Sequence, residues 1–411
     1  MKKTLFITML AAALMGGQVF ADYIPTATDA DKVDDGFYAG KHSETGDVSS
    51  ANVTINEEQE GGEDFSQSGV YGGFTGGEQT SAINNSVTMT GGQVDRVEGG
   101  YCENGIAMNN TVSVSGGQVG GSVYGGYSFD GNANNNIVTI SGGQVNEVRG
   151  GYSFNGNVAN NSVTISGGQV DGYMYGGLGD KSANGNTVTI KGGKVNNEVY
   201  GAWSAEVANG NTVSILGGQV SENVFGASSN GTANGNTVVL SSCVVGGYVV
   251  AANASGTSTD NAIEIYGTGS TCWGMDCMQL LNFHIADGVL LSQKALVNLI
   301  GTGSHDALDL KGVELGLYGD DVKDWSAFDG KSITLVSAKK AIKNATGSLG
   351  DVEIKGKDGE LLATASLALA NSSKSLVLSN IKGATPVPEP TTGTLSLLAL
   401  AALAARRRKH N

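Results

Sequence analysis

A repeat of about 25 residues fills the middle of the chain and limits what the chain can fold into. Successive copies begin 25 residues apart, once 26, and are marked by Gly-Gly-Gln-Val or, once, by Gly-Gly-Lys-Val at Gly91, Gly116, Gly142, Gly167, Gly192 and Gly217. A unit of this size cannot bury its own apolar face, so it is stable only when stacked on its neighbours. The repeat therefore predicts a stacked, rod-like array.

Each copy contains a short segment in which apolar and polar residues alternate. In residues 161–166, Val163 and Ile165 alternate with Thr164 and Ser166. This period of two is typical of a strand with one apolar face. A Gly-Gly turn, a short Val-Tyr strand and a second Gly-Gly follow. With no helical period present, the pattern predicts an all-β, parallel β-solenoid of about eight coils over residues 69–253.

Stacking of the repeats predicts columns of identical residues. Two such columns are present, one of asparagine and one of alanine. One column is asparagine: Asn85, Asn110, Asn136, Asn161, Asn186, Asn211, Asn236 and Asn261. Amides stacked at strand spacing can hydrogen-bond along a ladder, so we interpret this column as structural. Alanine stands three residues earlier, at Ala82, Ala107, Ala133, Ala183, Ala208 and Ala233, which indicates a tight corner.

Two aromatic columns flank the second Gly-Gly. The first holds Tyr71, Tyr124, Tyr175, Tyr200 and Phe225, and the second holds Phe74, Tyr101, Tyr127, Tyr152 and Trp203. A row that faced solvent would offer flat apolar rings to sugars, which makes Tyr101, Tyr127, Tyr152 and Trp203 candidate glycan-stacking residues. The alternative, which we favour, is that the rings stack on one another.

Charged residues interrupt the first aromatic column at Glu98 and Arg149, and Arg96 aligns with Glu147. These two arginines are the only ones before the C-terminal tail. We expect each to lie about two coils, roughly 10 Å, from its opposite charge. Because an exposed ion pair contributes little stability, we interpret them as surface variation.

The repeat is flanked by two regions of different character. Residues 22–68 are acidic and weakly patterned, which predicts an arm or a cap over the open edge of the first coil. Residues 254–384 keep alternating segments without the repeat and predict a smaller β-rich region. Its acids Asp306, Asp309 and Glu314 lie close together in sequence, as carboxylates of a sugar cleft would, although alternating exposed acids on a strand explain them equally well.

Four cysteines, Cys102, Cys243, Cys272 and Cys277, would meet an oxidising compartment after export. Four cysteines allow three pairings. The short spacing favours a local disulfide between Cys272 and Cys277, whereas Cys102 and Cys243 lie too many coils apart to pair. No histidine is near a cysteine pair, so a zinc site is disfavoured.

Both ends of the chain have the composition of targeting signals. Residues 1–21 combine Lys2 and Lys3, an apolar stretch and a small residue, Ala21, before Asp22, which predicts a cleaved signal peptide. In residues 385–411, three prolines precede an apolar run at 395–405 and a basic cluster. That run predicts a hydrophobic helix, which is short for a bilayer that needs about 20 residues.

The tail resembles the PEP-CTERM sorting signal of Gram-negative bacteria. The resemblance rests on Val387, Pro388, Glu389 and Pro390, on the apolar run, and on Arg406, Arg407 and Arg408, in that order at the chain end. It implies processing by an exosortase-type protease, a membrane-held helix before processing, and delivery to the cell surface, outer membrane or extracellular matrix. The repeat style and domain order also resemble autotransporter-type β-helix proteins that carry such tails.

Composition excludes several classes of function. Acids exceed bases 39 to 24, for a net charge of −15, which argues against a nucleic-acid partner. The repeats contain few acids and almost no arginine or histidine, so clustered catalytic groups are not expected. We therefore expect a non-enzymatic structural or adhesive surface protein with no cofactor. The alternative is a β-helix protein that binds or degrades an extracellular polysaccharide or a host glycan.

Overall fold

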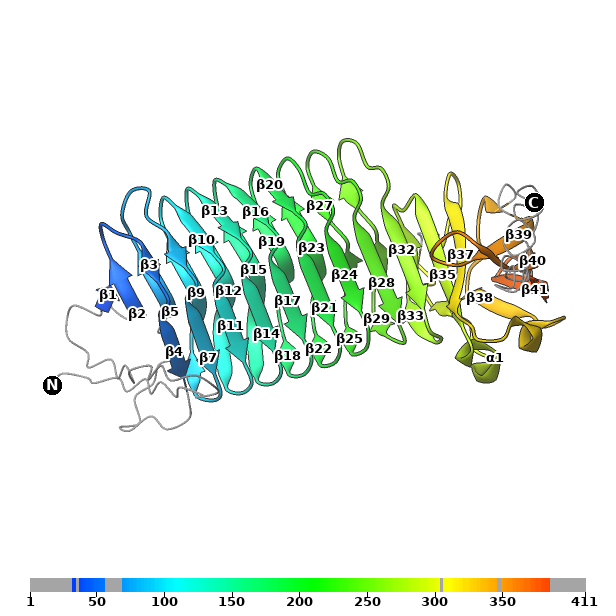
Figure 1. Ribbon diagram of the computed structural model, residues 1–411, viewed down its shortest axis with the longest axis horizontal. Coiled ribbons are helices and arrows are strands. Elements are labelled where there is room, and N and C mark those ends of the chain that lie inside the picture. Colours follow the sequence, from blue (N-terminus) through cyan, green and yellow to red (C-terminus); the bar gives the residue numbers. More distant parts are fainter. Residues whose placement is uncertain (1–31, 35–36, 56–68, 304–305, 346–348, 385–411) are drawn as a thin grey trace, which may run out of the picture.

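Strands from successive coils lie side by side along one rod (Figure 1). The computed structural model describes residues 32–34, 37–55, 69–303, 306–345 and 349–384. Between neighbouring coils the strands are parallel, and a residue pairs with the residue 25 or 26 positions later, as Val163 does with Val188 and Val112 with Val138. The predicted parallel β-solenoid is thus confirmed, with about nine turns.

One face of the rod, which we name the hydroxyl face, consists of the strands that carry the alternating segments. Its strands pair in chain order. They are β4 (Asn52–Ile55), β7 (Ser86–Met89), β11 (Thr111–Val114), β14 (Ile137–Ile140), β17 (Ser162–Ile165), β21 (Thr187–Ile190), β24 (Thr212–Ile215), β28 (Thr237–Ser241), β32 (Ala262–Tyr266), β35 (Leu280–Ala286) and β37 (Glu314–Asp321).

The next face along the chain, the glutamine face, follows the first Gly-Gly turn of each coil. Most of its strands are only two or three residues long. It contains β8 (Gln93–Val94), the first parts of β12 (Gln118–Ser128) and β15 (Gln144–Ser153), β18 (Gln169–Val170), β22 (Lys194–Val195), β25 (Gln219–Val220), β29 (Val244–Val245), β33 (Ser270–Cys272), β36 (Val297–Leu299) and β38 (Ile333–Ala338).

The third face, the Gly-Gly face, carries the second Gly-Gly and both aromatic columns. It contains β2 (Phe37–Ser43), β5 (Gly69–Thr75), β9 (Arg96–Cys102), the second parts of β12 and β15, β19 (Met174–Gly179), β23 (Val199–Ser204), β26 (Val224–Phe225), β27 (Ser228–Ser229), β30 (Tyr248–Val250), β31 (Asn253–Ala254) and β34 (Gly274–Asp276). A separate six-stranded sheet of short strands closes the coil: β3 (Val48–Ser49), β6 (Ala82–Ile83), β10 (Ile106–Met108), β13 (Asn132–Asn134), β16 (Asn157–Ala159) and β20 (Ser182–Asn184).

The core consists of stacked β-branched side chains, one set per coil. Val163, Ile165 and Val170 are fully buried, as are their counterparts in neighbouring coils. Because every coil supplies the same small set at the same positions, the apolar face that one coil cannot cover alone is buried by the next. The alanine column is also fully buried. Ala107 and Ala133 lie within the short strands β10 and β13, two residues before the left-handed residue at which the chain turns, so the predicted tight corner lies next to this column rather than in it.

The asparagine column forms the hydrogen-bonded ladder that its spacing predicts. Asn161 Nδ2 donates to Asn186 Oδ1 at 3.0 Å and to the Ala133 carbonyl at 2.9 Å. The Asn161 backbone N–H donates to the same Asn186 Oδ1 at 3.0 Å. The pattern continues from Asn85 to Asn261, where Gln279 Oε1 accepts the last amide bond. Each amide thereby satisfies corner groups that would otherwise be buried unpaired.

The residue before each ladder asparagine has a left-handed backbone. Its φ is +56° at Asn160 and +64° at Gly185, Gly210 and Gly235. Only glycine, asparagine and aspartate adopt this conformation readily, which explains why this column contains Asn or Gly in most coils and Asp260 in a late one.

The solenoid extends beyond the predicted limits of 69–253 on both sides. Within the acidic region 22–68, the strands β2 to β4 pair in parallel with the first recognised repeat. Beyond residue 253, β32, β35 and β37 continue the hydroxyl face. Sequence periodicity missed these coils because loops of different length interrupt the 25-residue spacing while the strand register is kept.

The C-terminal end is closed by antiparallel strands. β38 pairs with β41 (Ser375–Gly383), and β40 (Leu361–Ala370) pairs with both β41 and β39 (Gly350–Lys355). The 3₁₀ helix η1 (Trp325–Phe328) and helix α1 (Gly288–Ser292) lie in the same part of the rod. At the other end, β1 (Lys32–Asp34) pairs antiparallel with β2. Antiparallel end strands change the pairing direction and so limit further parallel stacking.

Candidate functional site

Both aromatic columns point outward from the Gly-Gly face, and their rings contact one another. The ring centroids of Tyr127 and Tyr152 lie 4.9 Å apart at an interplanar angle of 16°, and those of Tyr200 and Phe225 lie 4.7 Å apart at 7°. Rings of the two columns also meet, as Tyr124 and Tyr127 do at 5.7 Å. The backbone at Gly-Gly therefore places residues three positions apart on the same side of the sheet.

This stacking determines what the rings can offer a ligand. Tyr127 and Tyr152 are half-buried, and parallel stacking along the rod covers a ring face with the neighbouring ring. Tyr101 packs between Phe74, whose ring is stacked at 4.6 Å, and Tyr127, whose ring lies at 75° to that of Tyr101 with the centroids 5.0 Å apart. Trp203 differs: it pairs in register with Leu178 and Ser228 and has no ring contact within the described residues. Of the candidate glycan-stacking residues, Trp203 is the one without a stacked ring.

A cluster of charged residues lies among these rings. Arg149 Nη2 donates to Glu147 Oε1 at 2.8 Å and its Nη1 donates to the Tyr124 hydroxyl at 2.9 Å. The guanidinium carbon lies 4.7 Å from the ring centre of Tyr152 and 5.8 Å from that of Tyr175. Arg149 thus joins the two halves of the aromatic stack through cation–π contacts.

The charge pairs differ from the expected arrangement. Each arginine pairs with the glutamate two residues away on its own strand, Arg96 with Glu98 at 3.4 Å and Arg149 with Glu147 at 2.8 Å. Alternate residues of a strand lie on the same side of the sheet. Each arginine can therefore reach the glutamate two residues away on its own strand and does not need a partner two coils away. The interpretation as exposed surface variation is also wrong, because Glu98 has no exposed surface.

The sequence located Glu98 in the first aromatic column, but the burial of its carboxyl was not predicted. It occupies the place of a ring between Tyr71 and Tyr124. Its Oε2 is buried and has no hydrogen-bond partner. Burial disfavours the charged form and raises the pKa of the Glu98 carboxyl to about 8, against the opposing effect of Arg96. The sequence does contain a signal for this burial. Glu98 is an acid in a column of aromatic residues, and the neighbouring rings are large enough to cover its carboxyl group.

Glu98 should make stability depend on pH. Because its folded-state pKa of about 8 is above the unfolded value, the folded protein binds the proton more tightly. The stabilisation from protonation is therefore complete below about pH 4.5 and is lost as the pH rises towards 8. In urea unfolding measured from pH 5 to pH 9, Glu98→Gln should flatten this decline and raise the free energy of unfolding at pH 8 to 9.

The matched control for this prediction is Glu147→Gln, which removes a glutamate that also pairs with an arginine but is partly exposed. The pH-dependent decline should persist in that variant. An unchanged decline in Glu98→Gln would show that another group causes it.

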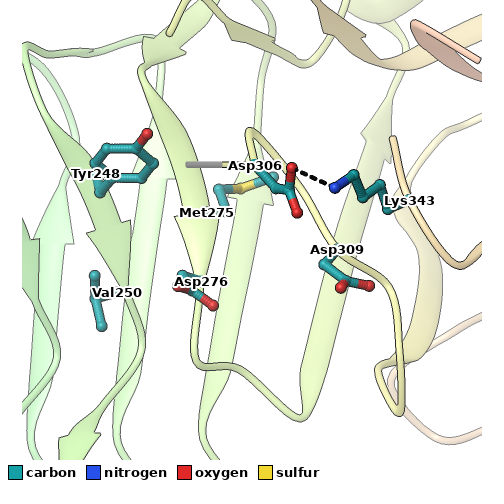
Figure 2. A pocket seen from close by; sticks show the side chains of 7 residues that line it. All are labelled: Tyr248, Val250, Met275, Asp276, Asp306, Asp309 and Lys343. Carbon is teal, nitrogen blue, oxygen red and sulfur yellow. Dashed lines mark ion pairs between the residues drawn. The ribbon is translucent and has the colours of Figure 1, made fainter. Parts of the chain in front are cut away.

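A pocket lies at the C-terminal end of the same outward column (Figure 2). Phe225 pairs with Val250, and Val250 pairs with Asp276, so the pocket continues the Gly-Gly face. Its volume is about 560 Å³, within the range of small-ligand sites. The lining residues are Tyr248, Val250, Met275, Asp276, Asp306, Asp309 and Lys343.

The pocket brings together two of the three acids that lie close in sequence. Lys343 Nζ pairs with Asp306 Oδ1 at 2.9 Å, as the dashed line in Figure 2 shows. Asp309 Oδ1 accepts a hydrogen bond from Asn344 Nδ2 at 2.8 Å, which lowers the pKa of the Asp309 carboxyl. A carboxyl with a lowered pKa is ionised at neutral pH and is a poor general acid. Glu314 begins β37 and does not line the pocket.

The cysteines are unpaired in the structure. Cys272 is fully buried, whereas Cys277 is exposed, and no disulfide joins them. Cys272 alternates inward on β33, which turns its thiol into the core, and burial raises its pKa. Cys102 and Cys243 are buried as well. No group of three or more metal-ligating side chains occurs within the described residues.

Residues 385–411, the predicted sorting tail, and residues 1–21, the predicted signal peptide, lie outside the described residues. Comparison with protein-family models matches residues 386–409 to the PEP-CTERM protein-sorting motif. Searches of curated proteins and of solved structures found no match. In the part of the chain that the structure describes, no helix is both long and apolar enough to cross a membrane.

Fold and tail together define a class: a β-solenoid protein with a C-terminal sorting signal. That signal is the PEP-CTERM motif, which contains the predicted residues Val387, Pro388, Glu389 and Pro390 and the arginines 406 to 408. The motif implies that the chain is an exported protein of a Gram-negative bacterium and is sorted by an exosortase.

Proposed function

We propose that this protein is a non-enzymatic component of the cell surface or extracellular matrix, with a structural or adhesive role. The observation that supports it most is the combination of a sorting motif with a long rod whose coils repeat one hydrogen-bonded frame. About nine turns at strand spacing give a rod of roughly 45 Å. Each end of the rod is covered by a strand that pairs in the antiparallel direction.

The geometry of the polar groups supports a role without catalysis. The buried carboxyl of Glu98 is covered by rings, and the carboxylates of the pocket face solvent or bond to neighbours. A glycosidase needs one ionised and one protonated carboxyl held apart across a groove. If the purified protein released reducing ends from polysaccharides, the non-enzymatic part of the proposal would fail.

The role itself is tested in cells. A strain that lacks the chain should attach less to polysaccharide-coated surfaces or form a weaker matrix than the parent, and re-expression should restore it. Surface protease treatment of intact cells should remove the rod from the parent strain. Equal attachment and equal matrix in both strains would contradict the structural or adhesive role.

Sorting should depend on the Pro-Glu-Pro motif. Replacement of Pro388 and Glu389 by alanine should leave the basic tail uncleaved and keep the chain with the inner membrane. The measurements are cell fractionation and mass spectrometry of the C-terminal peptide. Thr391→Ala, just beyond the motif, is the control and should be processed normally. A surface-exposed protein that still ended in residues 406–411 would contradict processing at this motif.

A second candidate is polysaccharide binding, which is one form of adhesion. Trp203 supports it, because this half-buried ring on the outer face has no stacked neighbour. The tyrosines 101, 127 and 152 support it less, since a stacked neighbouring ring covers at least one face of each.

A further inference from the structure

The hydroxyl face carries two straight rows of side chains that point away from the core, and from β7 to β28 these are threonine or serine except at Ile137 in the first row and Val239 in the second. The first row stands at the start of each strand and the second two residues later, as Ser162 and Thr164 do in β17. The strands from β7 to β28 pair without a register shift. The hydroxyls therefore repeat about every 4.8 Å along the rod and about 6.8 Å along a strand.

One hydroxyl of the first row, Ser86 Oγ, donates to Asn52 Oδ1 at 2.7 Å, and the others have no protein partner. Within the described residues, no side-chain hydrogen bond is formed by Thr88, Thr111, Ser113, Thr139, Ser162, Thr164, Thr187, Thr189, Thr212, Ser214 or Thr237. None of them is among the buried polar atoms without a partner either. Each of these hydroxyls thus faces water with one donor and two acceptor sites available.

The two rows contain no charged side chain from β7 to β28, in a protein of net charge −15. Lys191 is exposed, follows directly after β21, and stands two residues beyond Thr189 of the second row. The rows end at Glu264 and Asn282, where Asn282 Nδ2 and His284 Nε2 each lie 2.7 Å from a Glu264 oxygen. The uncharged strip is therefore bounded by groups that are already paired.

We propose that this strip binds a neutral polysaccharide chain that lies along the rod axis. This inference rests on the proposed adhesive role and identifies its surface. Sugar hydroxyls both donate and accept hydrogen bonds, as threonine and serine do. A polysaccharide presents hydroxyls along its whole length, so many weak contacts with the strip act together. Coils hydrogen-bond to each other through their edges, so the face offers no backbone groups to an added peptide strand.

Other occupants fit the strip less well. A charged polymer finds no opposite charge in the two rows. A second copy of the rod would bury roughly 450 Å² on each side, from seven strands of four residues, which is below the ~800 Å² of a stable protein interface. The strip also lacks the aromatic anchors on which protein partners depend; its largest apolar side chain is Ile137, which is 46% exposed.

The test uses the exported protein and measures its depletion from solution by insoluble cellulose, chitin and starch, with alginate as the charged polymer. The strip variant is Thr139→Val, Thr164→Val and Thr189→Val together. Valine already occupies this row at Val239, so the fold should tolerate the change. The control is Gln118→Val, Gln169→Val and Gln219→Val on the glutamine face, where Val244 is the natural precedent.

We expect the wild type to bind at least one neutral polymer, with little change in 1 M salt, and the strip variant to bind it at least tenfold more weakly. The control should bind as the wild type does. Thermal unfolding verifies that both variants are folded, and Thr164→Val alone, expected to weaken binding two- to threefold, replaces the triple variant if that one is unstable.

Three results would overturn the inference. Unchanged binding by the strip variant would show that the glycan binds elsewhere on the rod. If, in addition, Trp203→Ala alone abolished binding, the glycan would bind at the aromatic columns. Binding only to alginate, or binding abolished by salt, would show that the ligand is charged. No binding to any of the neutral polymers would remove the inference, while the attachment and sorting experiments would still decide the proposed surface role independently.

Discussion

Replacing Asn161 with alanine should lower the free energy of unfolding by roughly 2–6 kcal/mol, because two buried backbone groups lose their partners at about 1–3 kcal/mol each. The Oδ1 of Asn161 accepts from the backbone N–H of Asn136 at 2.8 Å and from its Nδ2 at 2.9 Å. Its own Nδ2 donates to the Ala133 carbonyl. Alanine supplies neither group, and the corner is closed to water.

The loss should be concentrated in the coils around the change, since each coil contacts only its neighbours. Native-state hydrogen exchange should show faster exchange at the Asn136 amide and in the coils on either side. The control is Asn160→Gly in the same coil. Asn160 is exposed and left-handed, and Gly185 and Gly210 occupy its column naturally. If both variants had equal stability, the ladder would contribute nothing beyond the packing of the coil.

Replacing Gly201 with alanine should cost about 3 kcal/mol or more, through overpacking. A Cβ at Gly201 would lie well inside contact distance of the Gly226 carbonyl oxygen and 3.1 Å from Val213 Cγ2. The obstacle is backbone of the next coil, which cannot rotate away. Glycine occupies this column from Gly72 to Gly226 and gives way to Ala251 only in the next coil.

The matched control is Gly210→Asn in the same coil. The backbone φ of Gly210 is +64°, nothing lies within 4 Å of a Cβ there, and asparagine fills the column in four earlier coils. Denaturant unfolding should show Gly210→Asn close to the wild type and Gly201→Ala strongly destabilised. Equal stability of the two would mean that the coils can separate locally without cost.

The fold was predictable because one unit is repeated. Asn161 has a counterpart in each neighbouring repeat, so the repeats of one sequence can be compared with one another. The asparagine ladder and the alternating core residues were predicted from this spacing alone. The outer coils were missed because Phe37–Ser43 and Leu280–Ala286 keep the register but not the 25-residue period. Strand pairing tolerates loops of different length, whereas a repeat search does not.

The site was less predictable because it depends on which side of a sheet a residue faces. Tyr124 and Tyr127 are three residues apart, which places them on opposite sides of a regular strand, yet Gly125 and Gly126 bring their rings 5.7 Å apart. The burial of Glu98 follows from the same contacts. The pocket joins Asp276 to Asp306 and Lys343 across loops, a relation that no spacing in the sequence expresses.

The asparagine ladder also has a direction, and this affects how the rod can form during export. Each ladder asparagine donates its amide and its backbone N–H to the Oδ1 of the following coil, up to Asn261, which donates both to Gln279. A chain that crosses a membrane N-terminus first presents each coil before its acceptor arrives. Every coil therefore completes the hydrogen bonds of its corner only when the next coil has emerged. In such a chain folding follows translocation one coil behind, and Gln279 supplies the acceptor for the last ladder asparagine.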